Sequence, residues 1–252
     1  MSFAVRASAY DQFMGRYSAR LAPVFADFAS MAPESRVLDV GCGPGALTAE
    51  LLKRFGPASV SAIEPSEPFV TAARERHPGI TVLQASAEDI PFGDATFNAS
   101  LAQLVVHFMA DPVAGLREMR RVTRRHGVVA ACVWDHAGDG SPLSLFWEAV
   151  HQLDPRAEGE ATLAGVREGH LVELFEAAGL REIVPGVLSI GVEHETFEDW
   201  WDPFMLGVGP AGAYVAGLGA PERAQLRERC RRMLPEPPFT VAARAWAARG
   251  SV

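Results

Sequence analysis

Hydrophobic positions follow two different periods along the first half of the chain. In residues 18–29, Val24, Phe25 and Phe28 lie three, four and seven positions after Leu21, as on one face of an amphipathic helix. From residue 36, short runs rich in β-branched residues alternate with segments of helical pattern. Such an alternation predicts a parallel sheet with helices on both faces.

The same pattern predicts where the individual elements lie. The predicted helices are 18–29, 46–55, 66–77, 112–125, 143–153, 170–179 and 222–234. The predicted strands are 36–40, 59–63, 80–84, 97–104, 127–134, 182–192 and 239–248. Residues 136–142 and 154–165 are predicted to be loops. No helix or strand is predicted between 195 and the helix at 222, a stretch rich in glycine and aromatic residues.

Composition limits the class of protein. The chain has 252 residues, of which 48% are hydrophobic and 21% charged, so wholesale disorder is excluded. This length suits one α/β domain with an inserted cap, or two domains. A net charge of −8 argues against broad binding to nucleic acid or to anionic lipid.

The cysteine pattern and the N-terminal residues indicate a cellular compartment. Cys42, Cys132 and Cys230 lie far apart and form no CxxC pair, which suits a reducing compartment and predicts neither a zinc site nor a disulfide framework. No apolar run approaches the roughly 18 residues of a membrane span. The N-terminal residues lack the pattern of a secretory signal. We therefore expect a cytoplasmic protein without a metal or a membrane partner.

The segment VLDVGCGPGALT (37–48) carries the most informative chemical signal. A strand delivers the chain to Asp39, and glycines at 41, 43 and 45 turn it sharply into the next helix. Glycine tolerates positive φ and lets the backbone approach a ligand closely. A unit of this kind binds small ligands at the carboxyl end of the strand. The G-x-G-x-G spacing differs from the G-x-G-x-x-G dinucleotide fingerprint, which weakens a dinucleotide interpretation.

An acidic residue stands at the end of the next strand. Glu64 follows Gly45 by nineteen residues, and its carboxylate can accept hydrogen bonds from both hydroxyls of a ribose. The glycine turn and this acid together predict a ligand that contains an adenine nucleoside.

Five segments resemble, in order, the motifs of the class I S-adenosylmethionine-dependent methyltransferases, in particular the small-molecule group called type 11. VLDVGCGPG resembles their first motif, and AIEPS resembles the second. ASAEDIPF (85–92) is similar to the third element, FNASLAQLVVHFMADP (97–112) to the fourth-strand segment, and LREMRRVTRRHGVVAACVWD (116–135) to the helix, turn and fifth strand. The lead-in at 10–29 resembles the N-terminal lid. The continuous resemblance covers residues 35–135 and identifies no substrate.

The resemblance implies a fold and a cofactor. The fold is a Rossmann-like, doubly wound α/β fold with a mostly parallel seven-stranded sheet and a helical cap. The implied boundaries are 1–35 for lid helices, 36–194 and 236–252 for the core, and 195–235 for a cap insertion. The implied cofactor is S-adenosyl-L-methionine. The residues expected to contact it are Tyr10, Tyr17, Asp39, Gly41, Cys42, Gly43, Glu64, Pro65, Ser86, Ala87, Glu88 and Gln103.

Several of these residues have an expected role. Glu64 is the implied ribose acid, and Ser86 to Glu88 surround the adenine, with Ser86 where the family often carries Asp. Asp39 orders the glycine loop or contacts the amino acid end of the cofactor through water. Tyr10 and Tyr17 close over the cofactor, or else anchor the first helix on the sheet. Two further departures from the family pattern are Asn98 for Asp and His126 for Pro.

Candidate catalytic groups lie just past the fourth strand. His107 titrates near neutral pH and is a candidate general base, with a structural role as the alternative. Gln103 orients the cofactor or the acceptor, or else is a hydrogen-bonded loop residue. Six aromatic residues suit an apolar acceptor pocket or, alternatively, core packing: Trp134, Phe146, Trp147, Trp200, Trp201 and Phe204.

These patterns predict transfer of a methyl group from S-adenosylmethionine to a small organic acceptor by in-line displacement, a reaction that requires no metal. Two alternatives stay open: a nicotinamide-dependent oxidoreductase, and a non-catalytic cofactor-binding or scaffold protein. The expected partner is a small-molecule acceptor rather than nucleic acid. The sequence indicates neither the methylated atom nor the oligomeric state.

Overall fold

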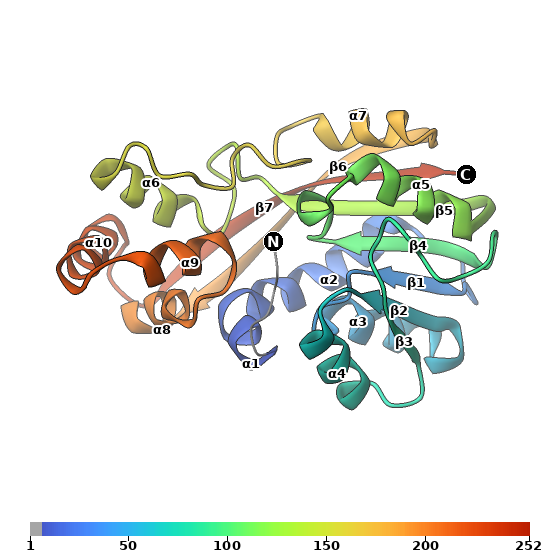
Figure 1. The fold of residues 1–252 in the computed structure, drawn as a ribbon, viewed down its shortest axis with the longest axis horizontal. Helices are drawn as coiled ribbons and strands as arrows, with labels where there is room; N and C mark the ends of the chain where they lie inside the picture. Colours follow the sequence, from blue (N-terminus) through green and yellow to red (C-terminus); the bar gives the residue numbers. More distant parts are fainter. Residues whose placement is uncertain (1–6) are drawn as a thin grey trace.

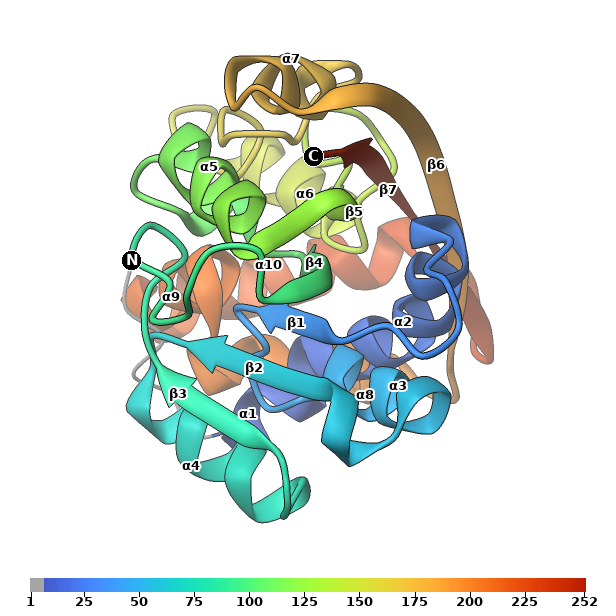
Figure 2. The same ribbon diagram turned by 90° about the vertical axis from the view of Figure 1, so that its right-hand side faces the viewer.

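The centre of the structure, a computed structural model that describes residues 7–252, is a seven-stranded sheet. Residues 1–6 of the predicted lid lie outside the described residues. The strand order is β3-β2-β1-β4-β5-β7-β6, which can be followed from bottom to top in Figure 2. The strands are β1 (Val37–Val40), β2 (Val60–Glu64), β3 (Thr81–Gln84), β4 (Phe97–Gln103), β5 (Thr123–Trp134), β6 (Arg181–His194) and β7 (Phe239–Ser251).

The sheet is mostly parallel. Strands β1 to β5 pair in parallel, and β7 runs antiparallel to both of its neighbours, β5 and β6. The order reverses between β1 and β4, which is where doubly wound folds open a crevice for ligands. The predicted Rossmann-like fold class is confirmed.

Helices cover both faces of the sheet (Figure 1). One face packs against α2 (Arg16–Ala29), α3 (Ala46–Phe55) and α4 (Glu67–Arg76). The other face packs against α5 (Pro112–Val122) and α7 (His170–Ala177). Successive residues of β4 serve opposite faces, with Leu101 in the core on the α2 side and Ala102 in the core on the α5 side.

The described part of the predicted lid up to residue 29 is a helical stretch without a break. It consists of α1 (Ala7–Tyr10), the π-helical turn η1 (Asp11–Gly15) and α2. Figure 1 shows it between the sheet and the helices of the cap. Leu21 and Phe25 of α2 are fully buried, as the predicted apolar face of this helix requires.

A group of helices lies beyond the carboxyl ends of the parallel strands (Figure 1). Its members are α6 (Ser144–Leu153), α8 (Phe197–Trp201), the 3₁₀ turn η4 (Asp202–Leu206), α9 (Gly209–Gly217) and α10 (Ala220–Met233). The elements α8, η4 and α9 lie where no element was predicted. The signal was present, because Trp200, Trp201 and Phe204 follow Phe197 at three, four and seven positions and all four are buried. Thr196 caps α8 by accepting a hydrogen bond from the Asp199 N–H at 3.0 Å.

One helix boundary differs from the prediction for a local reason. The helix predicted to reach residue 125 ends at Val122, and Thr123 already adopts an extended backbone with φ −91° and ψ 133°. The Thr123 hydroxyl donates to the Met119 carbonyl at 2.7 Å, which supplies a side-chain partner at the helix end. His126, at φ 62°, then marks an irregular start of β5 before its regular pairing with β4. In residues 7–252, none of the helices is both long and apolar enough to cross a membrane.

Candidate active site

The glycine turn after β1 is tied to the neighbouring strand. The N–H groups of Gly41 and Cys42 both donate to the Ile63 carbonyl, at 2.8 and 3.0 Å. Gly41 has a φ of 69°, and a Cβ on it would lie 2.6 Å from the Val105 side chain. Gly43 has a φ of 54°, and a Cβ there would meet no atom within 4 Å. The turn therefore requires glycine at 41 for conformation and space, and at 43 it leaves open room for a ligand.

Asp39 fixes the start of the following helix. Its carboxylate is buried at the end of β1 and accepts a 2.6 Å hydrogen bond from the Thr48 hydroxyl in α3. Burial raises the pKa of Asp39 to about 7, an effect that the Thr48 hydrogen bond partly opposes. This contact fits the expectation that Asp39 orders the glycine loop.

Glu64 ends β2 with both carboxylate oxygens engaged by backbone. Oε2 accepts from the Gly43 N–H and Oε1 from the Ser66 N–H, each at 2.9 Å. Burial raises the pKa of Glu64, and these two N–H bonds lower it. A carboxylate offers about four acceptor positions, so the group keeps capacity for two hydroxyl donors.

The third wall of the site follows β3. Ser86, Ala87 and Glu88 form it, and Glu88 Oε1 accepts from the N–H of Ala110 at 2.8 Å and of Asp111 at 3.3 Å. This contact joins the loop after β3 to the loop that follows the 3₁₀ turn η3 (Val106–Phe108).

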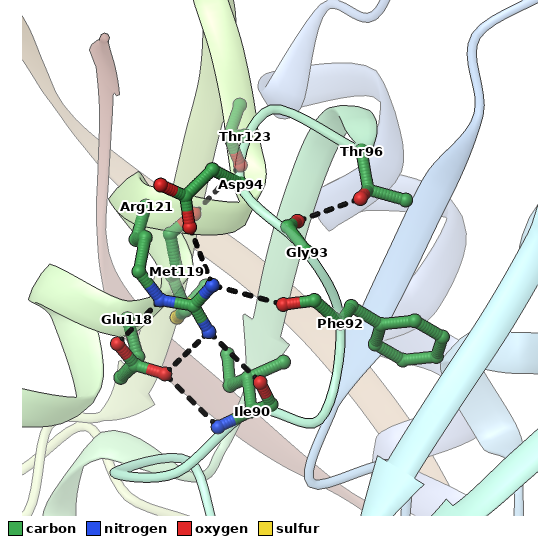
Figure 3. Close-up of polar contacts among 9 residues, drawn as sticks. All are labelled: Ile90, Phe92, Gly93, Asp94, Thr96, Glu118, Met119, Arg121 and Thr123. Atoms are coloured by element: carbon green, nitrogen blue, oxygen red, sulfur yellow. Dashed lines mark hydrogen bonds and ion pairs between the residues drawn. The ribbon is translucent and has the colours of Figure 1, made fainter.

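An arginine in α5 secures the continuation of that wall (Figure 3). The Arg121 guanidinium donates to the backbone carbonyls of Ile90 and Phe92 at 2.8 and 2.9 Å, and to Asp94 at 2.8 Å. It also forms two 2.7 Å bonds with Glu118, whose carboxylate accepts from the Ile90 N–H at 3.1 Å. The loop that carries Ser86 to Glu88 is thus anchored at its far end.

Residues of α1 and α2 line one side of the cleft. The Tyr10 hydroxyl lies 3.3 Å from the Ser18 hydroxyl, and the Tyr10 ring meets Phe69 edge-on at 5.5 Å. Gln103 at the end of β4 donates through Nε2 to the Ser18 carbonyl at 3.1 Å. Gln103 Oε1 is buried and has no hydrogen-bond partner within residues 7–252. An Arg76–Asp11 ion pair ties η1 to α4.

These groups enclose a cleft of about 330 Å³ at the carboxyl ends of β1, β2 and β4. Eleven of the residues expected from the sequence line it: Tyr10, Asp39, Gly41, Cys42, Gly43, Glu64, Pro65, Ser86, Ala87, Glu88 and Gln103. The buried carboxylate, the unpaired amide oxygen and the largely apolar wall fit a nucleoside with a polar end.

Comparison with known proteins assigns this part of the chain. Residues 38–131 match the sequence model of the family described as "Methyltransferase domain". The chain is 31% identical over 150 residues to 2-methyl-6-phytyl-1,4-hydroquinone methyltransferase 2 of Oryza sativa subsp. japonica, an alignment that covers 59% of this chain and 39% of that protein. It is 32% identical over 123 residues to a malonyl-[acyl-carrier protein] O-methyltransferase of Erwinia pyrifoliae, with 44% and 46% covered.

Solved structures agree in fold. An Anaeromyxobacter dehalogenans protein, assigned by inference as a type II methyltransferase, is similar with a TM-score of 0.64 and 25% identity, over 91% of this chain and 95% of that chain. An Aquifex aeolicus S-adenosylmethionine-dependent methyltransferase gives a TM-score of 0.51 at 22% identity, over 68% and 86%. The chain spans less than half the length of the two curated relatives named above.

The match covers the strands, the glycine turn and the acid that line the cleft. Residues 38–131 are thus similar in sequence to a methyltransferase domain, and the chain shares the fold of the solved methyltransferase structures above. The nicotinamide alternative loses its support, because the family model and the curated relatives above are methyltransferases. Within residues 7–252, no three His, Cys, Asp or Glu side chains are grouped so as to hold a metal ion.

Tyr17 lies outside the lining of this cleft. Its hydroxyl lies 2.9 Å from His194 Nε2 on β6. Arg16 beside it forms two bonds to Asp199, at 2.8 and 2.9 Å, and one to His194 Nδ1 at 3.0 Å. The helical turn that brings Tyr10 over the cleft directs Tyr17 toward β6. This position favours the alternative in which Tyr17 anchors the first helix on the sheet.

His107 also lies outside the lining of the cleft. It is buried in η3 and lines a second, smaller space, which we call the inner cavity. Burial, and then the nearby His136, lower the pKa of His107 well below its ordinary value, so the ring is neutral at pH 7. His107 Nδ1 has no hydrogen-bond partner in residues 7–252. A neutral imidazole keeps a lone pair and can therefore accept a proton.

The aromatic residues divide between this cavity and the core. Trp134 lines the inner cavity. Phe146 stacks on Phe204 with ring centroids 4.4 Å apart, and Trp200 packs on Phe204 at 5.0 Å. Trp147 lines a groove on the outside of the domain. For most of the six, core packing is therefore the role that the contacts support.

Two polar residues of the inner cavity were missed by the sequence analysis. His136 lies in the loop after β5, and Glu160 lies in the irregular segment before α7. Glu160 is 4% exposed and accepts a 2.9 Å hydrogen bond from Trp147 Nε1. Neither belongs to a motif or a regular element, so no local pattern indicates that they line the same cavity as His107.

Proposed function

We propose that the protein transfers the methyl group of S-adenosylmethionine to a small organic acceptor by in-line displacement. The observation that carries the proposal is Glu64, a buried carboxylate at the cleft wall whose oxygens are oriented by the N–H groups of Gly43 and Ser66. A carboxylate held in this way accepts hydrogen bonds from a ribose diol. The names of the two relatives above refer to different acceptors, 2-methyl-6-phytyl-1,4-hydroquinone and malonyl-[acyl-carrier protein].

Each wall of the cleft has a proposed part in holding the cofactor. Glu64 binds the ribose, and Ser86 to Glu88 surround the adenine. The glycine turn, ordered by Asp39, and Gln103 with its unpaired Oε1 hold the amino acid end. When bound, S-adenosylmethionine supplies a methyl group that is already activated. The residues of this chain then need to align the acceptor and to exclude water. Tyr10, in the proposed lid, covers the cleft and helps to exclude water.

We also propose that residues 1–35 form the lid, 36–194 and 236–252 the core, and 195–235 the cap. Support comes from α8, η4, α9 and α10, which all lie within 195–235, a range that contains no strand of the sheet. A cytoplasmic location is supported by the sparse, dispersed cysteines.

Calorimetric titration with S-adenosylhomocysteine tests the proposal. Saturable binding is expected for the wild type, and Glu64→Ala should weaken it at least about tenfold, since a hydrogen bond to a charged group contributes roughly 1.5–3 kcal/mol. Glu67→Ala, at an exposed position three residues away, is the matched control and should bind as the wild type does. NADH should not bind. Absence of nucleoside binding in the wild type would overturn the proposal, whereas binding without turnover of any acceptor would favour the non-catalytic alternative.

A further inference from the structure

The C-terminal end of α4 holds the glycine turn from outside the cofactor cleft. Arg76 Nη1 donates to the Pro44 carbonyl at 3.2 Å, and His77 Nε2 lies 3.1 Å from the Gly45 carbonyl. A carbonyl oxygen only accepts, so His77 Nε2 carries the hydrogen of this bond. A Cβ on Gly45 would lie 2.5 Å from His77 Nε2, so the close approach of the two segments requires glycine here. One helix end thus fixes two successive carbonyls of the turn.

The same arginine also holds the predicted lid. Its guanidinium forms two hydrogen bonds with the Asp11 carboxylate, one of them from Nη1 to Oδ1 at 3.1 Å. Asp11 directly follows Tyr10, and both Tyr10 and Pro44 line the cofactor cleft. The planar guanidinium, which carries several donors in fixed directions, therefore connects the lid side of the cleft with its glycine turn.

Burial divides the lid into a part fixed in the core and a part outside it. The short helix α1 has no buried residue, whereas Phe13 in η1 is buried in the main core. Figures 1 and 2 both show α1 beside α4. Two contacts that join these helices are the Asp11–Arg76 ion pair and the edge-on contact between the rings of Tyr10 and Phe69. The α-helical pattern is interrupted at η1, and such π-helical turns are frequent at functional sites. α1 is therefore the part of the lid that can open without disturbing the core.

The Asp11–Arg76 ion pair has the strength of a contact that opens repeatedly. Its two side chains are 39% and 41% exposed, so the pair is weak and is screened by salt. Gly15 leaves room for the carboxylate, since a Cβ there would lie 3.3 Å from Asp11 Oδ1. A guanidinium held by Asp11 stays in place for the Pro44 carbonyl, whereas a free one loses that orientation to its many rotamers. The position of α1 and the conformation of the glycine turn are therefore linked.

We propose that Arg76 is a positioning residue that couples closure of α1 over the cleft to the conformation of the glycine turn, and thereby sets how long the cofactor stays bound. This inference rests on the proposed binding of S-adenosylmethionine in the cleft. With α1 closed, Asp11 orients the guanidinium that holds the Pro44 carbonyl. With α1 open, this orientation is lost and the cofactor can leave. Because such coupling is reciprocal, a bound cofactor keeps α1 closed.

The dissociation rate constant of S-adenosylhomocysteine, measured by surface plasmon resonance, tests the coupling. Asp11→Asn should raise it about threefold at low salt, an effect of the size that an exposed ion pair allows. Arg76→Met also removes the donor to Pro44 and should raise it about tenfold. The double variant should equal Arg76→Met, because Asp11 acts through Arg76. Arg76→Lys keeps the charge and should restore part of the loss. Glu75→Gln removes one charge at the neighbouring exposed position and is the control, which should dissociate as the wild type does.

Salt dependence and hydrogen exchange separate this role from a merely structural one. The dissociation rate constant of the wild type should rise with ionic strength toward that of Asp11→Asn, which should itself change little. With S-adenosylhomocysteine bound, the backbone amides of residues 7–12 should exchange faster in Asp11→Asn than in the wild type, and those of α2 should not. Additive effects in the double variant, a wild-type rate that ignores salt, or unchanged exchange at residues 7–12 would overturn the inference and leave the proposed function intact. Failure of the wild type to bind S-adenosylhomocysteine would instead overturn the proposed function.

Discussion

The cofactor cleft and the inner cavity adjoin each other, yet they satisfy their polar groups in opposite ways. In the cleft, Glu64, Asp39 and Glu88 are held by backbone N–H groups or by a hydroxyl of the same structural unit. In the inner cavity, nitrogens of His107, Trp134 and His136 lack any partner among residues 7–252. The cleft is preorganised by the protein alone, whereas these nitrogens of the cavity receive no hydrogen bond from the described chain.

The largest effect is expected in the cleft, from Gly41→Ala. A left-handed backbone costs a non-glycine residue roughly 1–2 kcal/mol, and the new Cβ would overlap the Val105 side chain at 2.6 Å. We expect the free energy of unfolding to fall by about 3 kcal/mol and S-adenosylhomocysteine binding to be lost. Gly207→Ala, at φ 71° and ψ 20° with no atom within 4 Å of its Cβ, is the control and should lose about 1 kcal/mol. Equal losses in urea denaturation would contradict the role of Val105.

The free energy of unfolding should depend on pH through one buried acid in the cofactor cleft and one at the inner cavity. Burial raises the pKa values of Asp39 and Glu160 to about 7, above the ordinary values near 4 that the unfolded chain has. Both groups therefore favour the folded state fully below pH 4, and this contribution is lost as the pH rises through about 7. The free energy of unfolding should fall between pH 5 and pH 7.5.

Asp39→Asn and Glu160→Gln should each remove at least about 1 kcal/mol of that fall, because an amide does not titrate in this range. Each amide still offers an acceptor, to Thr48 and to Trp147 respectively, so the local contacts are kept. Glu158→Gln, at an exposed position beside Glu160, should leave the fall unchanged. A pH profile that is the same in all three variants would show that neither acid is held as the structure indicates.

A substitution of Arg121 tests whether the shape of the cleft depends on hydrogen bonds from a residue outside its lining. Its side chain is one-third exposed, so its ion pairs with Asp94 and Glu118 contribute little, and the bonds to the Ile90 and Phe92 carbonyls matter more. Arg121→Met should lower the free energy of unfolding by about 2 kcal/mol and weaken nucleoside binding about fivefold. Arg120→Met, on the exposed side of the same helix, should change neither quantity. Unchanged binding in Arg121→Met would mean that the loop after β3 holds its shape alone.

The same contrast explains how far the sequence could predict the site. The glycine turn, Asp39 and Glu64 lie within 28 residues and follow a strand, turn, helix and strand in order, so local pattern suffices to bring them together. Gln103, at the end of β4, joins them because parallel strands end at one edge. The inner cavity draws on Tyr10, His107 and Glu160, which only tertiary packing brings together. The helix α8 was missed although its aromatic residues have helical spacing, and α9 was missed because three of its nine residues are glycine.

The smallest expected effect separates the two indole groups directly. Trp147 donates its N–H to the buried Glu160 at 2.9 Å, whereas the Trp134 N–H has no partner in residues 7–252. Trp147→Phe removes a satisfied bond and leaves the carboxylate without its donor, which should cost about 2 kcal/mol. Trp134→Phe loses packing volume but also removes an unpaired polar group, and these effects oppose each other. Its free energy of unfolding should therefore change by less than about 1 kcal/mol in urea denaturation, and equal losses for the two variants would mean that the Trp134 N–H is already satisfied in the folded protein.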